Sequence, residues 1–289
     1  ITPLLTSITG VATTQCEIIL QACLPALLSA QPAALSWLLD HAQRVPTPGP
    51  SESGLPSGDG DLHAMRLTMA VLKVARDLGL LTGEGLTAHA SRLEQALDAA
   101  DEQVAHDALH VVCSAQKQIE PVSSNELQLL RRFWPTRIKG ASPHARKQLL
   151  NAMRKLLQRL KRSTFGSKRD LRDLDQLRGA DLSQGAPFQL QPIAEKRDYA
   201  RAVADWLVWL RTLLEQQLYP GVPVTRALFA LELYELFVDT WAPLPPDSPA
   251  TTGEPAEDPT ASLVCMIGGG GFEPASLYGP CIASRLVQL

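Results

Sequence analysis

Apolar residues recur every three or four positions over most of the chain, which is the period of an amphipathic α-helix. Two helix starts are well specified. Ser123 and Glu126 have the spacing of a capping box, and Ser142 places a hydroxyl cap before Pro143 at the first helical position. We expect the helix that follows Ser123 to end before Pro135, because proline opposes continuation of a helix. The predicted helices are residues 13–30, 33–43, 61–78, 87–100, 101–116, 124–134, 143–162, 194–219 and 222–241.

Segments without this period divide the chain, because runs of proline, glycine, serine and charged residues cannot pack as helices. Pro32 separates the first two helices, and Pro220-Gly221 separates the last two. The predicted layout is a helix pair at 1–44, a flexible loop at 45–60, helical repeats with a basic face at 61–162, a partly ordered insertion at 163–193, a helix pair at 194–241 and a disordered or irregular tail at 242–289.

A weak internal repeat bears on the fold class. Similar helix starts lie at Ala105, Arg146 and Arg226, and their spacing fits a two-helix unit of about 40 residues used once and then twice. Abundant leucine and alanine, with aromatic residues at only 5%, favour helices over a β-sandwich or barrel. The sequence predicts an all-α, HEAT/armadillo-like α-solenoid of antiparallel helix pairs, with an irregular helical bundle as the alternative.

The compartment is indicated by cysteine usage and by the lack of sorting signals. Five cysteines, an odd number and without a C-x-x-C motif, argue against a disulfide framework and a zinc site. Residues 18–39 are uncharged, but Pro25 and Pro32 interrupt them, so we interpret the run as buried helices and expect no transmembrane span. The chain begins at Ile1 without a secretory signal, so we expect a cytoplasmic protein and interpret the chain as a fragment or a mature form.

The charge is sorted along the chain. Residues 127–169 hold 13 of the 27 lysines and arginines and none of the 30 acidic residues. On a helix whose apolar face carries Leu149 and Leu156, the opposite face is cationic, with Arg159 at its edge. Like charges at i, i+4 repel, so helix stability does not explain this face. It suits a polyanion such as RNA, because neutralising phosphates releases counterions; a solvated face that keeps the protein soluble is the alternative. The predicted RNA-binding residues are Arg131, Arg132, Arg137, Lys139, Lys147, Arg154, Lys155, Arg159, Lys161, Arg162, Lys168 and Arg169.

Catalytic motifs are scarce. His106 and His110 share a helix face but lack the glutamate of an H-E-x-x-H metal site. Four glycines at 268–271 precede Phe272-Glu273-Pro274 and lack the Lys-Ser/Thr of a phosphate-binding loop. Phe133 and Trp134 are expected to close a hydrophobic layer rather than stack on a base. We therefore expect a protein that is not an enzyme, with no metal and no cofactor.

Several short motifs occur in an order typical of one family. The stretch from residue 105 to residue 241 resembles the thyroid adenoma-associated protein (THADA) family, very large helical-repeat proteins with a DUF2428-type architecture. The matching motifs are Asp107-Ala108-Leu109, Val122-Ser123-Ser124-Asn125-Glu126, Ser142-Pro143-His144-Ala145-Arg146-Lys147-Gln148, Leu218-Tyr219-Pro220-Gly221 and Thr225-Arg226.

The resemblance implies a non-catalytic partner of an FtsJ-type methyltransferase, which methylates a ribose 2′-oxygen in the tRNA anticodon loop. The chain would bind the tRNA and position it. Two other hypotheses remain open: a protein-interaction scaffold with no RNA role, and a metal-dependent hydrolase that uses His106 and His110. Nuclease-resistant partner binding would favour the first of these, and stoichiometric zinc would favour the second.

Overall fold

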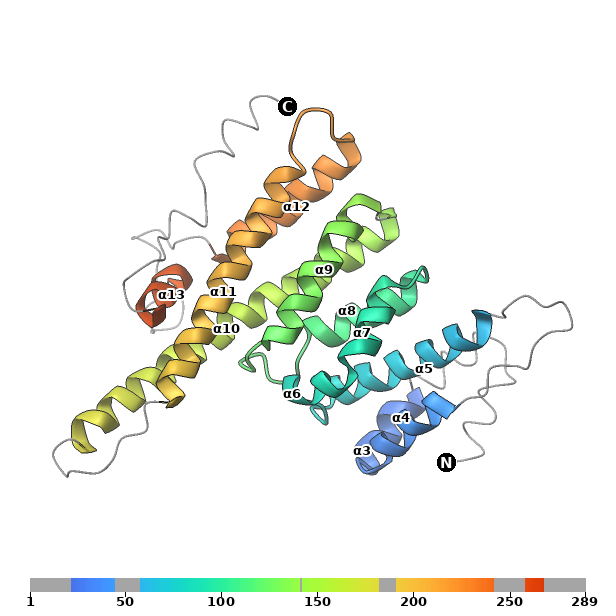
Figure 1. Ribbon diagram of the computed structural model, residues 1–289, viewed down its shortest axis with the longest axis horizontal. Helices are drawn as coiled ribbons and strands as arrows, with labels where there is room; N and C mark the ends of the chain where they lie inside the picture. The colour runs from blue at the N-terminus through green and yellow to red at the C-terminus, as the bar shows by residue number, and fades with distance from the viewer. Residues whose placement is uncertain (1–21, 45–57, 141, 182–190, 242–257, 268–289) are drawn as a thin grey trace, which may run out of the picture. The chain divides into compact units, whose positions relative to one another are not determined.

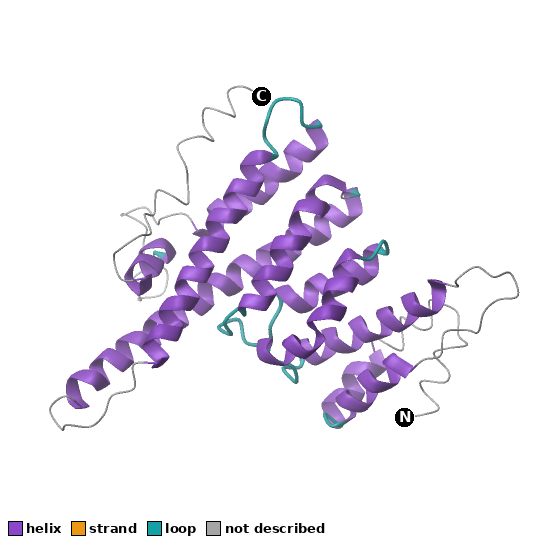
Figure 2. Ribbon diagram, viewed as in Figure 1, coloured by secondary structure: helices purple, strands orange, loops and turns teal. Residues whose placement is uncertain are grey.

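The computed structural model describes residues 22–44, 58–140, 142–181, 191–241 and 258–267, and in these ranges every regular element is a helix (Figures 1 and 2). The predicted all-α class is therefore confirmed. The chain divides into two compact units, Ile1–Lys117 and Gln118–Leu289, called unit 1 and unit 2 below. Most of the predicted loop at 45–60 and most of the predicted tail lie outside the described residues.

Unit 1 is built around α5, which packs against α4 and α8. Pro32 separates the first helices, as predicted, and the carboxylate of Asp101 starts α8 by accepting a hydrogen bond from the Val104 amide at 2.8 Å. The buried Arg76 donates to the carbonyls of Leu81 and Ser114 and so ties the turn after α5 to the end of α8. The elements are α3 (Leu24–Ala30), α4 (Ala34–Arg44), α5 (Gly58–Asp77), α6 (Gly83–Leu86), the 3₁₀ turn η2 (Thr87–His89), α7 (Ala90–Asp98) and α8 (Glu102–Cys113).

Unit 2 is organised around the long helix α10, which packs against α11, α12 and α13. Leu156 and Leu160 of α10 are buried with Trp206 of α11 and with Phe237 and Trp241 of α12. The helix pair around Pro220-Gly221 is present, and its turn uses Gly221 with a φ of +93°, a left-handed conformation that glycine adopts without strain. The elements are α9 (Ser124–Gly140), α10 (Pro143–Asp181), α11 (Gln191–Gln216), α12 (Val224–Trp241) and α13 (Pro259–Ile267).

Both predicted helix starts in unit 2 are confirmed by their hydrogen bonds. The Ser123 amide donates to the Glu126 carboxylate at 2.6 Å, and the Glu126 amide donates to the Ser123 hydroxyl at 3.2 Å, which completes the capping box. The Ser142 hydroxyl accepts from the Ala145 amide at 3.2 Å, ahead of Pro143. These starts are encoded by four consecutive residues, so local sequence was sufficient to find them.

The predicted end of α9 before Pro135 is wrong, because the helix continues to Gly140 with Pro135 inside it. Proline removes one amide donor, but Trp134 on one side of it and Ile138 on the other are both buried. Packing of these side chains keeps the segment helical. The aromatic residues Phe133 and Trp134 are in the core, as predicted.

The predicted end of α10 near Arg162 is also wrong, because the helix continues to Asp181. Small residues in this stretch face neighbouring segments instead of ending the helix. Ser163 and Thr164 are buried, and each hydroxyl donates to the Leu160 carbonyl. A Cβ on Gly166 would lie 3.8 Å from that of Ile119, so the glycine allows close approach of the chain before α9.

One helix, α13, lies within the region predicted to be an irregular tail. Asp258 caps it by accepting hydrogen bonds from the amide and the hydroxyl of Thr260, at 2.8 and 2.7 Å. Its apolar face, which includes Leu263 and Met266, is buried. The aspartate-proline start followed by an apolar run is a helix signal that the composition of the surrounding segment obscured.

Candidate nucleic-acid interface

The first part of α10 exposes a face that carries cations and no carboxylate. Between Pro143 and Arg169 the helix has no acidic residue, and its first carboxylate, Asp170, pairs with Lys196 at 2.6 Å. Asn151 and Gln158, which are neutral, share the exposed face with the cations. We call the five exposed cations the α10 basic surface: Lys147, Arg154, Lys155, Arg162 and Arg169.

The cations of α10 occur as pairs that recur every seven or eight residues: Arg146-Lys147, Arg154-Lys155, Lys161-Arg162 and Lys168-Arg169. The second residue of every pair is exposed. The first residue of three pairs turns toward other helices of unit 2. Because seven residues make nearly two helical turns, the second residues of successive pairs lie on one side of the helix.

Arg159 does not belong to this surface, which corrects its assignment as an RNA-binding residue. Its side chain is 2% exposed and donates to both oxygens of the buried Glu126 carboxylate, the closer at 3.1 Å. It also donates to the carbonyls of Glu120 and Pro121, at 3.1 and 2.9 Å. Arg159 therefore anchors the chain before α9 to α10. A helical wheel could not separate it from its exposed neighbours, because Glu126 is 33 residues away in sequence.

Lys161 and Lys168 are half-buried at the contacts of α10 with α12 and α13. The Nζ of Lys161 donates to the Thr240 carbonyl in the last turn of α12, at 3.0 Å. Burial lowers the pKa of Lys161, and the nearby Asp258 carboxylate partly offsets this effect. The Nζ of Lys168 donates to the Ser262 hydroxyl of α13 at 3.1 Å. Both lysines are engaged within the protein.

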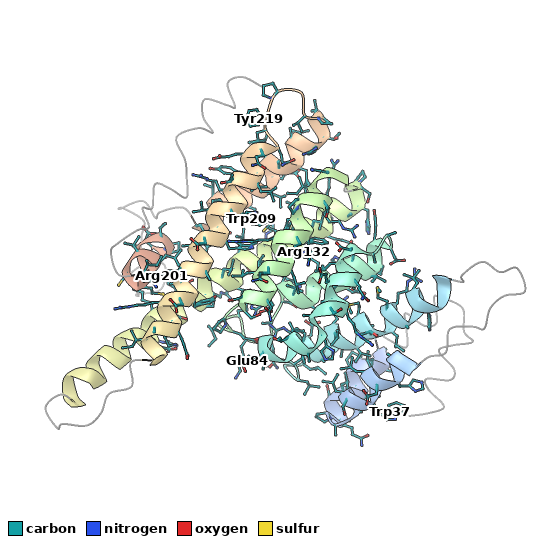
Figure 3. All side chains as sticks on the ribbon, in the orientation of Figure 1. Trp37, Glu84, Arg132, Arg201, Trp209 and Tyr219 are labelled. Atoms are coloured by element: carbon teal, nitrogen blue, oxygen red, sulfur yellow. The ribbon has the colours of Figure 1, made fainter. Side chains whose placement is uncertain are left out.

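The α9 cations lie on a second helix of unit 2. Arg131, Arg132 and Lys139 are exposed, and Arg137 is half-buried over the Phe133 ring. The Arg131 guanidinium lies 5.8 Å from the centre of the Trp209 ring of α11. Figure 3 labels Trp209 on α11 and Arg132 on α9. Arg146, a cation that our predicted set left out, lies over the Phe229 ring at 5.8 Å. The aromatic rings restrict the positions of these guanidinium groups without neutralising their positive charge.

The described residues offer little else with catalytic potential. No cluster of three or more histidine, cysteine or acidic side chains in them could hold a metal ion. His110 is 3.2 Å from the Ser114 hydroxyl and 3.9 Å from Asp77, but both contacts use the same nitrogen, Nδ1, so the three groups do not form a relay. Across the ranges covered by the structure, no helix is long and apolar enough to cross a membrane.

Unit 1 also contains an open cavity of about 380 Å³ between α4, α5 and α7. Its apolar lining includes Ala42, Met65 and Met69. Its polar lining consists of Thr68, Arg92 and Gln95. The Thr68 hydroxyl is bonded to the Ala64 carbonyl at 2.8 Å. The lining contains no carboxylate, imidazole or thiol, so it provides no evident acid, base or nucleophile.

Comparisons with known proteins agree with the predicted resemblance. A mouse protein named tRNA (32-2′-O)-methyltransferase regulator THADA is 25% identical over 236 residues, which is 80% of this chain and 11% of the mouse protein. The proteins of the same name from dog and chicken are 31% and 32% identical over 146 residues, 49% of this chain and 7% of each relative. This chain therefore spans about a tenth or less of the length of these relatives. No solved structure shows a significant match.

The family model described as "Trm732, TPR repeats" matches residues 2–242. The match takes in α3 to α12 and ends before α13. TPR repeats are built from pairs of antiparallel helices, which agrees with the predicted solenoid, whereas its more specific HEAT or armadillo type remains a prediction. The relatives are named as regulators of a methyltransferase rather than as catalysts. Because the match covers most of the sequence, the chain belongs to the Trm732 family of TPR-repeat proteins, which confirms the predicted THADA-type resemblance.

Proposed function

We propose that this chain is a non-catalytic part of a tRNA methylation regulator. It binds tRNA through the α10 basic surface and supports a partner methyltransferase of the FtsJ type in 2′-O-methylation of an anticodon-loop ribose. The observation that carries the proposal is the exposed, acid-free face of α10, with its five cations. The name of the relatives supports the link to tRNA methylation.

The chemistry of the surface fits a contribution by positioning. Lysine and arginine contacts to phosphates give affinity that does not depend on base sequence, and they set the orientation of the RNA. Holding a substrate in register raises the rate of a reaction that another subunit performs. We propose that the α9 cations extend the contact with tRNA beyond α10; these are Arg131, Arg132, Arg137 and Lys139.

The test is charge reversal with a matched control. The variant Arg154→Glu/Lys155→Glu/Arg162→Glu should lose most affinity for a tRNA transcript. The control Lys117→Glu/Arg197→Glu/Arg201→Glu makes the same change at exposed positions on other segments and should bind nearly as the wild type does. If about five phosphates are engaged, log affinity should fall with log salt with a slope of about −3.5 to −4.5. Equal affinity of the two variants would reject the proposal. The methylation rate with the partner present should follow the affinity.

A protein-interaction scaffold is the second candidate, and the exposed face of α12 favours it. Val224 and Leu228 are 72% and 54% exposed and lie one turn apart. Glu232, Glu235 and Asp239 follow on the same exposed face, so this side of unit 2 would repel a phosphate backbone. Under this candidate, Val224→Glu/Leu228→Glu would abolish nuclease-resistant co-purification of the methyltransferase, and reversal of the α10 cations would leave methylation unchanged.

A further inference from the structure

The short helix α13 lies alongside α10 and α11 and occupies part of the α10 flank (Figure 1). Asp258 caps its first turn, and Leu263 and Met266 anchor its apolar face. Ala261 and Cys265 are on its exposed side. The helix has nine residues. A helix of that length has little stability in water by itself, so its structure depends on docking.

Docked α13 acts on two cations of the recurring pairs. Ser262 accepts a hydrogen bond from Lys168 at 3.1 Å. Asp258 contributes a negative charge near Lys161, which is otherwise bonded to the Thr240 carbonyl of α12. The next residues, Arg162 and Arg169, remain exposed. The α10 basic surface is thus bordered by α13, whose Ser262 engages Lys168 and whose capping residue Asp258 acts electrostatically on Lys161.

We infer that α13 is an intramolecular competitor of the polyanion, so that its release adds Lys168 and a less encumbered Lys161 to the α10 basic surface. This inference rests on the proposed function and concerns the regulation of the same site. Because α13 lies outside residues 2–242, the regulation would belong to this chain in addition to the repeats matched by the family model. Competition means that docking of α13 weakens RNA binding. Because such coupling is reciprocal, RNA binding must weaken the docking of α13 to the same extent.

Two single substitutions in the full chain distinguish the effect of undocking α13 from the effect of adding a negative charge to it. Leu263→Glu places a carboxylate at a fully buried position and should undock α13, whereas Ala261→Glu adds the same charge on the exposed side and should leave α13 docked. Amide hydrogen exchange over residues 259–267 reports which has occurred. Affinity is measured with an unmodified tRNA transcript at about 50 and about 200 mM salt.

Leu263→Glu should bind the tRNA transcript more tightly than Ala261→Glu. One or two further phosphate contacts steepen the salt slope by about 0.7 to 1.8, so the ratio of the two affinities should be about three- to tenfold larger at the lower salt concentration than at the higher one. Adding Lys168→Gln to Leu263→Glu should reduce the gain, because it removes one of the added cations. Saturating RNA should also speed exchange over residues 259–267 in the wild type, because of the reciprocal coupling.

Equal affinities of Leu263→Glu and Ala261→Glu would overturn the inference. A gain that Lys168→Gln leaves undiminished, or protection of α13 by RNA, would also overturn it. The proposed function fails separately, if reversal of Arg154, Lys155 and Arg162 leaves wild-type affinity unchanged. If circular dichroism shows that Leu263→Glu loses helix beyond α13, Leu263→Ala/Met266→Ala removes the same contacts without a buried charge and is held to the same outcomes.

Discussion

Replacing Arg159 by methionine tests the anchor between α10 and the chain before α9. The change keeps a long apolar stem but removes the guanidinium that lies 3.1 Å from Glu126, and both side chains are 2% exposed. Breaking a buried pair by removing one partner leaves an uncompensated charge and typically costs about 3–5 kcal/mol. The amide of Ser123 still donates to Glu126 at 2.6 Å. We therefore expect Arg159→Met to lower the free energy of unfolding by about 3 kcal/mol, the lower end of that range.

The assay is urea unfolding at pH 7 followed by tryptophan fluorescence, because Trp134, Trp206, Trp209 and Trp241 all belong to unit 2. Glu126→Gln supplies the decisive comparison, since it keeps the capping acceptor and removes the charge. It should destabilise the wild type but stabilise Arg159→Met by about 1–3 kcal/mol. The reasoning is refuted if Glu126→Gln has the same sign in both backgrounds, or if Arg159→Met costs less than about 0.5 kcal/mol.

Three further substitutions test local features. Gly221→Ala should destabilise unit 2 by about 1 kcal/mol in urea unfolding, because an added Cβ meets no atom within 4 Å and only the φ of +93° opposes it. Gly140→Ala, in α9 and equally open but without positive φ, should instead leave stability unchanged or raise it by up to about 1 kcal/mol. Ser123→Ala should cost about 1 kcal/mol through loss of the α9 cap, and an unchanged urea midpoint would contradict the capping role. Partial burial alone would raise the pKa of Asp101, but the Arg66 and Val104 hydrogen bonds outweigh it and lower that pKa. Asp101→Asn should therefore cost up to about 1 kcal/mol at pH 7. The difference from wild type should shrink once the pH falls below the ordinary aspartate pKa of about 4, and it should vanish below the lowered pKa of folded Asp101; thermal unfolding at pH 7 and through the acid range checks this sign.

What the sequence could predict depended on how local each cause was. The starts of α9 and α10 follow from Ser123, Glu126 and Ser142, which act within one turn. The continuation of α9 through Pro135 and of α10 past Ser163 depends on neighbours that are distant in sequence, and rules for isolated residues gave the wrong helix ends.

The same distinction applies to the candidate interface. Charge counting and helical periodicity identified the stretch and its exposed face, including Arg154 and Arg162. They could not tell that Arg159 pairs with Glu126, or that Lys168 contacts Ser262, 94 residues away. The contact of Lys168 could not be predicted because it depends on α13, which was not among the helices predicted from the sequence. Asp258-Pro259 and the apolar run after them are nevertheless a signal for that helix.

The seven-residue spacing of Lys155, Arg162 and Arg169 has a consequence for the shape of the polyanion that we propose binds here. A straight α-helix turns about 20° short of two full rotations in seven residues. The side chains of Lys155, Arg162 and Arg169 therefore follow a slow left-handed path, advancing about 10 Å along the axis at each step. A straight rod laid parallel to α10 would drift off this path, whereas a strand that curls around the helix would stay in register with successive cations. Under the proposed function, this geometry would favour a curved segment of phosphate backbone.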